Sequence, residues 1–442
     1  MPRPLLHKYF GSAFTLTSHR FTLKRFTVNG NEQHKPQNIQ TIYIILLFGN
    51  VLATSFIWGI DTIFLLNAGL SNFEAFAVNG FFSLGQVIFE VPTGIIADTF
   101  GRRMSYLLGS VTLAFSTLLY LVMWQANGPF MGWAISSMLL GLGYTFFSGA
   151  LEAWLVDALH ATNFKGSLDQ VFAKGQITGG IAMLSGSVAG GFIAQITNLG
   201  VPYVLRAAVL MLTFIGAFFL MKDLGFNPRK MNRPLAEMKN IFKNSIDNGF
   251  KNPSVRWVML AAPFTTGVSF YIFYALQPFL LELYGDKTAY GIAGLVAALS
   301  AGAQIAGGIL AHRIRKLFNR RTTALILGVF LTGVILLAVS GINSFIIVLI
   351  LIFLWGIVFS AIRPIRQAYL NGIIPSEQRA TVLSFDSLVG SSGGIIVQPA
   401  LGKAADIWSY GTSYMIAGFI QWGALPFLFL ARRQKAKSDK IT

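Results

Sequence analysis

Long apolar segments follow one another along most of the chain, and they constrain its fold more than any other feature. Each is long enough to cross a membrane as a helix at about 1.5 Å of rise per residue. A chain in lipid must satisfy its backbone polar groups internally, so such runs predict an all-α integral membrane protein. Twelve spans are expected, at residues 41–67, 72–98, 103–125, 130–158, 168–196, 201–222, 254–283, 287–312, 322–341, 343–370, 379–406 and 410–431.

Composition and charge agree with a polytopic membrane protein. The mean hydropathy is +0.61 and only 12% of residues are charged. The net charge of +17 could indicate nucleic acid, but all except three of the 34 Lys and Arg residues lie in the tails, in alternate loops or at the adjoining helix ends. The exceptions are Arg206, Lys287 and Lys403. This asymmetry follows the positive-inside rule, predicts that both termini are cytoplasmic and gives no reason to expect a nucleic-acid partner.

Several chemistries have no counterpart in the sequence. There is no cysteine, so disulfides and thiolate metal sites are excluded. We find no phosphate-binding loop, metal-ligand cluster or nucleophile motif. We therefore predict no metal, no cofactor and no enzymatic activity.

The one long internal connection is basic and divides the chain into two sets of six spans. The predicted organisation is a basic cytoplasmic tail (1–40), a six-helix bundle (41–222), a cytoplasmic linker (223–253), a second six-helix bundle (254–431) and a cytoplasmic tail (432–442). The first tail could also be a targeting segment or an over-long start. A weak internal repeat at a shift of 214, which aligns Gly94 with Gly308, favours two parallel bundles related by an axis along the membrane normal.

A glycine-rich polar turn separates the second and third spans. Its pattern resembles the loop between helices 2 and 3 of the major facilitator superfamily, G-x-x-x-D-x-x-G-R-R/K, although Thr99 replaces a common basic residue. The resemblance implies a latch that closes the cytoplasmic side of a transporter, with Arg102 paired to Asp157. The alternative is a set of helix-end charges in the headgroup layer. The predicted latch comprises Gly94, Asp98, Gly101, Arg102, Arg103 and Asp157.

Charged residues inside the spans need a reason, because each costs about 2.5–3.5 kcal/mol at a helix centre on insertion scales. A carboxyl group removed from water can exchange protons near neutral pH, and drug:proton antiporters of this superfamily often hold such an acid on helix 1 or 4. Asp61 and Glu152 are the predicted proton-coupling residues, with structural hydrogen bonding as the alternative. Glu152 is also expected to face Arg366, or Arg363, across an inner gate, unless each charge pairs within its own half.

Two further patterns bear on the substrate. Gly186, Gly190 and Gly191 form a predicted helix-packing motif that partly resembles a glycine motif of exporters. Aromatic residues on the expected cavity helices favour a lipophilic or amphiphilic solute, although such residues often serve packing instead. The predicted substrate-cavity residues are Trp58, Tyr144, Phe147, Trp154, Tyr271 and Tyr274.

The sequence thus predicts a secondary active transporter that works by alternating access, resembling bacterial drug:proton antiporters. The expected activity is proton-coupled efflux of a small lipophilic or amphiphilic compound by a monomer in the plasma (inner) membrane. Its partners would be a small-molecule substrate, protons and the lipid bilayer. The alternatives are a proton symporter or uniporter that imports a small nutrient, and a non-transporting receptor or lipid-moving protein on the same fold.

Overall fold

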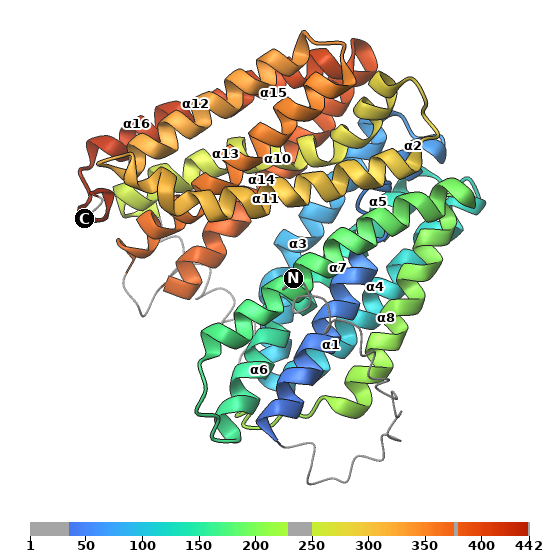
Figure 1. The fold of residues 1–442 in the computed structure, drawn as a ribbon, viewed down its shortest axis with the longest axis vertical. Helices are drawn as coiled ribbons and strands as arrows, with labels where there is room; N and C mark the ends of the chain where they lie inside the picture. The colour runs from blue at the N-terminus through green and yellow to red at the C-terminus, as the bar shows by residue number, and fades with distance from the viewer. Residues whose placement is uncertain (1–34, 229–249, 375–378, 441–442) are drawn as a thin grey trace, which may run out of the picture.

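The computed structural model describes residues 35–228, 250–374 and 379–440, which form an all-α structure, as predicted (Figure 1). Most of the predicted tail (1–40) and linker (223–253) lies outside the described residues. The helices are α1 (Pro36–Ser55), α2 (Asp61–Asn67), α3 (Asn72–Phe100), α4 (Arg102–Gln125), α5 (Phe130–Phe147), α6 (Ala150–Ala161), α7 (Leu168–Ile196), α8 (Gly200–Leu220), α10 (Pro253–Tyr284), α11 (Tyr290–Lys316), α12 (Arg321–Ser340), α13 (Phe345–Asn371), α14 (Arg379–Ile407), α15 (Tyr410–Trp422) and α16 (Leu425–Arg433).

Eleven helical segments in the described part of the chain are long and apolar enough to cross a membrane. They correspond to eleven of the twelve predicted spans, with α5 and α6 counted together and α15 and α16 counted together. The span predicted at 379–406 forms α14, a helix of 29 residues. The chain is therefore a multi-pass membrane protein, and a twelfth span stays a prediction.

Three predicted spans are broken rather than continuous, and the last of them, 410–431, is interrupted at Gly423 and Ala424 between α15 and α16. The first is interrupted between α1 and α2, where Gln277 of α10 satisfies the exposed backbone: its Nε2 donates to the Trp58 carbonyl at 2.8 Å, and its Oε1 accepts from the Thr62 N–H at 3.0 Å. The fourth is interrupted between α5 and α6, where Gly149 adopts a left-handed conformation with φ of 67°. Broken helices persist in a membrane only where other groups satisfy the freed backbone, and Gln277 does so at the first break.

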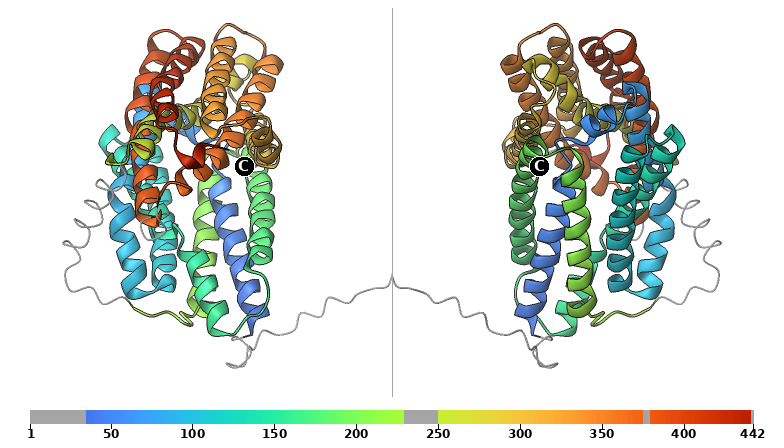
Figure 2. Two further views of the ribbon diagram at one scale, coloured as in Figure 1. Left: turned by 90° about the vertical axis from the view of Figure 1, so that its left-hand side faces the viewer. Right: turned by 90° about the vertical axis from the view of Figure 1, so that its right-hand side faces the viewer.

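The helices form two bundles. The N-terminal bundle comprises α1–α8 and the C-terminal bundle comprises α10–α16, and the views in Figures 1 and 2 show them as separate groups. The bundles meet where α3 packs against α14, where α7 packs against α11, and where α2 touches α10. Because α3 and α14 run in opposite directions, the end of each helix lies beside the start of the other.

Hydrogen bonds between the bundles gather at one end of the molecule, which we call the closed end. Asp406 accepts from the N–H groups of Asn72 and Phe73 at the start of α3, at 2.9 and 2.8 Å. Gln195 of α7 accepts from the Gly291 N–H of α11 at 2.8 Å. Toward the other end, the open end, the bundles diverge (Figure 1). Of the basic segments predicted to be cytoplasmic, the described residues Arg102 and Arg103 between α3 and α4 and residues 313–321 between α11 and α12 adjoin the open end.

Candidate functional site

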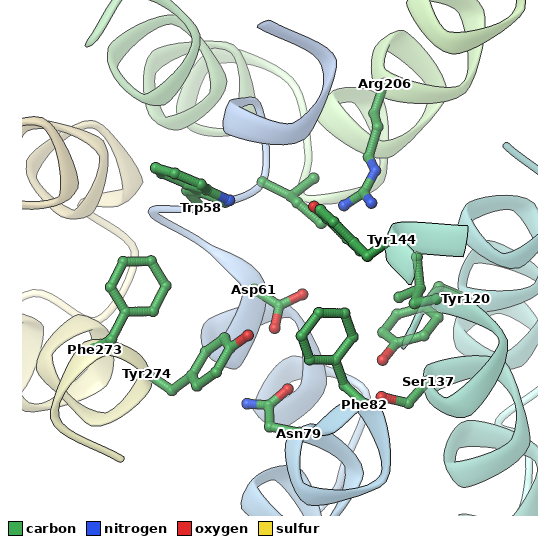
Figure 3. A pocket seen from close by; sticks show the side chains of 12 residues that line it. Trp58, Asp61, Asn79, Phe82, Tyr120, Ser137, Tyr144, Arg206, Phe273 and Tyr274 are labelled. Atoms are coloured by element: carbon green, nitrogen blue, oxygen red, sulfur yellow. The ribbon is translucent and has the colours of Figure 1, made fainter. Parts of the chain in front are cut away.

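A small cavity lies between the bundles near the closed end (Figure 3). Its volume is about 50 Å³, enough for a few water molecules. The break after α1 contributes its upper wall, α3, α4, α5 and α8 contribute the N-terminal side, and α10 closes it from the other bundle. The lining residues are Ile57, Trp58, Asp61, Asn79, Phe82, Tyr120, Ser137, Leu140, Tyr144, Arg206, Phe273 and Tyr274.

Asp61 supplies the one carboxyl group among the residues that line this cavity. It is the first residue of α2, directly after the helix break, and its side chain is 9% exposed. The Tyr203 hydroxyl donates to its Oδ1 at 3.0 Å. Tyr203 is itself held by stacking on Phe64, with ring centroids 4.1 Å apart. The break and this aromatic support therefore fix a buried acid at the point where the two bundles meet.

Arg206 of α8 supplies the positive charge of the same cavity. Its side chain is 2% exposed, and its Nε and Nη2 have no hydrogen-bond partner among the described residues. The guanidinium lies 5.9 Å from the centroid of the Tyr144 ring, and Figure 3 shows it pointing toward Tyr144 and Asp61. Burying an ion without a partner costs several kcal/mol, roughly, so the Asp61 carboxylate nearby is its natural counter-charge. The sequence marked Arg206 as an unusual charge but gave it no role.

A larger cavity of about 470 Å³ lies toward the open end, between α3 and α14. Glu90 of α3 lines it, and the Ser148 hydroxyl at the α5–α6 break donates to Glu90 Oε1 at 2.7 Å. Phe82 and Glu90 are eight residues apart on α3, with Gln86 between them, so the three share one helix face. Phe82 lines the small cavity and the other two line the large one, so this face joins the two cavities.

The predicted substrate-cavity residues fall into two sets. Trp58, Tyr144 and Tyr274 line the small cavity. The other three serve packing. The Phe147 ring lies edge-on to Tyr106 at 4.7 Å, Trp154 is 2% exposed and donates to the Lys222 carbonyl at 2.7 Å, and Tyr271 packs on Phe76 at 4.8 Å. Packing was the alternative role for these aromatic residues, and it describes Phe147, Trp154 and Tyr271.

The predicted latch residues lie at the open end. Arg102 pairs with Asp98 at 2.8 Å, one turn away, and no ion pair joins it to Asp157 in the described structure. The turn is instead held by Asp223, which the sequence did not single out: its Oδ1 accepts from the Arg103 N–H at 2.9 Å. Burial raises the pKa of Asp223, and this hydrogen bond opposes that shift. Gly101, with φ of 104°, takes a conformation that favours glycine.

The predicted inner-gate charges do not meet in this conformation. Arg366 of α13 makes a two-pronged pair with Asp386 of α14, at 2.7 and 2.5 Å, inside the C-terminal bundle. An arginine of the neighbouring helix thus satisfies the buried Asp386 carboxylate. Glu152 is half-buried on α6, and Arg363 is exposed. A pairing of Glu152 with either arginine stays a prediction for another conformation.

The glycines of α7 lie where helices approach closely. A Cβ on Gly186 would meet the Ser55 side chain of α1 at 2.8 Å. Gly190 faces the Phe56 backbone at the first helix break. A Cβ on Gly191 would meet the Gly294 backbone of α11 at 2.9 Å, across the contact between the bundles. The motif therefore brings α7 against both α1 and the opposite bundle.

Two bundles of membrane helices around a buried acid and arginine define a polytopic carrier-like protein. The sequence profile described as Major Facilitator Superfamily matches residues 43–397 and 291–441. The chain belongs to this superfamily, so it is a transporter rather than an enzyme.

The chain is 23% identical over 410 residues to multidrug resistance protein 2 of Bacillus subtilis, covering 90% of this chain and 96% of that protein. The fold is similar to the nucleoside transporter NupG, with a TM-score of 0.73 at 12% identity over 89% of this chain and all of NupG (100%). It is also similar to a bacterial homologue of the human lysosomal transporter Spinster in an inward-facing, unoccupied conformation, with a TM-score of 0.69 at 14% identity over 92% and 98% of the two chains.

Proposed function

We propose that this protein is a proton-coupled secondary transporter in which Asp61 takes up and releases the coupled proton. The observation that carries this proposal is the placement of Asp61. It is a buried acid in a cavity formed by both bundles, next to the contacts that hold the closed end shut. The proposed halves are the two predicted six-helix bundles, 41–222 and 254–431.

The open end is proposed to face the cytoplasm. The distribution of Lys and Arg supports this orientation through the positive-inside rule. The similarity to a Spinster homologue in an inward-facing conformation also supports an open end that faces the cytoplasm. Alternating access then requires the closed-end contacts of Asp406, Gln195 and Gln277 to break as the bundles rock about the central cavity.

The charges of the small cavity provide a mechanism of exchange. With Asp61 ionised, its negative charge balances Arg206. Protonation of Asp61 leaves Arg206 as an uncompensated positive charge in a site of low dielectric, where repulsion between like charges is strong. A cationic solute and a proton therefore exclude one another, which is the requirement for antiport.

We propose efflux of a small amphiphilic compound as the direction. The large cavity of about 470 Å³ can hold a small amphiphilic compound, whereas the small cavity between Trp58, Tyr144 and Tyr274 holds only a few water molecules. The distant relative named as a multidrug resistance protein and the partial exporter motif on α7 point the same way. The plasma membrane is the proposed location, and the monomer is the proposed unit of function.

Arg206 favours a second candidate function, proton-coupled import of an anionic nutrient. Its Nε and Nη2 have no hydrogen-bond partner among the described residues and could bind a carboxylate with two parallel bonds. Such an anion would bind best when Asp61 is protonated, so anion and proton would move together. The direction in which protons move relative to the substrate thus distinguishes export by antiport from import by symport.

Purified protein in liposomes that contain a pH-sensitive dye would test the proposal. Acid-loaded vesicles would receive a panel of lipophilic cations, uncharged amphiphiles and short-chain carboxylates. We expect cation-dependent proton release that is lost in Asp61→Asn, and Glu152→Gln tests the other predicted acid. Glu74→Gln is the matched control, because glutamine preserves the capping box at the exposed start of α3.

Each outcome has a definite meaning. Proton release that persists in Asp61→Asn would overturn the assigned role of Asp61. Proton uptake together with a carboxylate would replace export by the second candidate. The absence of coupled proton movement with every compound would contradict proton-coupled transport.

A further inference from the structure

We propose that Glu90 is the binding site for the ammonium group of a cationic amphiphilic substrate. This inference rests on the proposed transport function and adds to it the group that binds the cation. Glu90 lies in the large cavity, apart from Asp61, on a surface that both bundles share.

The immediate surroundings of Glu90 suit a cation. Ser148 donates to Oε1, and Oε2 has no donor among the described residues, so the carboxylate keeps free accepting capacity. The opposite wall is formed by three serines that share one face of α14, Ser384, Ser387 and Ser391. Among the described residues that line the cavity there is no Lys or Arg. The lining therefore carries one negative charge and several hydroxyl acceptors.

The size of the large cavity limits the substrate. At about 470 Å³ it can hold a drug-sized body beside Glu90, whereas the small cavity beside Phe82 and Tyr144, at about 50 Å³, holds only a few water molecules. The apolar body of the substrate therefore lies in the large cavity, with its ammonium group at Glu90. A primary ammonium has three donors for the carboxylate and hydroxyl acceptors. Replacing it by an uncharged amide removes the charge and leaves the body unchanged.

The test compares two fluorescent probes with the purified full-length protein in detergent. The first is a dansyl group joined by an eight-carbon chain to a primary amine, and the second is its N-acetylated counterpart. We expect the amine to bind more tightly than the amide. Glu90→Gln should weaken amine binding by about tenfold to a hundredfold and leave amide binding unchanged, because it removes a charge-assisted hydrogen bond. Glu90→Asp should restore part of the preference for the amine.

Glu74→Gln is the matched control on the same helix and should change neither affinity. Amine binding that is unchanged in Glu90→Gln overturns the proposal. An equal loss of both affinities would also overturn it, because it would show a structural role for Glu90. Displacement of the amine by equimolar NaCl would overturn it as well, because it would assign the site to an inorganic cation. Proton coupling lost in Asp61→Asn but kept in Glu90→Gln with unchanged amine binding would refute this site alone and leave the transport function standing.

Discussion

The closed end offers a quantitative test of how the two bundles are held together. Asp406 at the end of α14 accepts from two N–H groups, those of Asn72 and Phe73, at the start of α3. Both are donors that a helix N-terminus leaves without an intrahelical partner, and the helix dipole favours a negative charge there. Asp406 thus acts as the cap of a helix that belongs to the other bundle.

Replacing Asp406 by alanine should shift the equilibrium between closed and open forms of this end. Loss of an N-terminal cap typically costs about 0.5–2 kcal/mol. Asp406 is exposed, so we take about 1–2 kcal/mol from that range, which corresponds to a change of about 5–30-fold in the equilibrium constant. Asp406→Asn keeps one accepting oxygen and should give a smaller shift.

Electron-spin distance measurements between the bundles would detect this shift. The chain has no cysteine, so Asn127→Cys and Asn343→Cys would place single labels on closed-end loops of the two bundles. We expect a population at longer distance in Asp406→Ala. The control is Asp286→Asn, because Asp286 bonds only within its own loop, to Thr288 at 2.8 and 2.6 Å. A distance distribution that Asp406→Ala leaves unchanged would refute the assigned role of this contact.

Three other substitutions test separate contacts. Gln277→Ala leaves the freed backbone at the first helix break without partners, so it should lower thermal stability by about 1–3 kcal/mol, measured by unfolding in detergent; an unchanged stability would contradict this. Gly191→Val inserts a side chain between α7 and α11 and should destabilise the closed form by about 1–3 kcal/mol relative to the open form. Spin labels on the closed-end loops should then move apart, and unaltered distances would argue against close packing of α7 and α11. Arg366→Ala should destabilise the protein by about 3 kcal/mol by leaving Asp386 unpaired, and Arg366→Ala with Asp386→Ala should recover most of that loss, as thermal unfolding would show; a double variant no more stable than the single one would contradict the pairing.

The sequence predicted the helical architecture because hydropathy is a local property. A run of apolar residues indicates a span whatever lies around it. The helix breaks were missed for the opposite reason. The break after α1 is stabilised by Gln277, which is 215 residues away from Thr62 in sequence. Nothing near residues 56–60 in the sequence shows that such a partner exists.

The candidate site was only partly predictable. Asp61 and Arg206 stood out because charges inside spans are costly, but their shared cavity depends on how α2 and α8 pack. The aromatic residues show the same limit. Tyr274 faces the cavity while Tyr271, one turn earlier on the same helix, is fully buried in the C-terminal bundle. Helical position alone does not distinguish these two faces before the partner helices are known.

Proton release on substrate binding would test the central proposal, exchange of a proton at Asp61, most directly. Purified protein in weakly buffered detergent solution would be mixed with a lipophilic cation that it transports, and the pH change would be recorded. We predict release of protons by the unaltered protein and by Glu74→Gln, and no release by Asp61→Asn although the cation still binds. Equal proton release by Asp61→Asn would contradict the proposal, because the exchanged proton would then belong to another group.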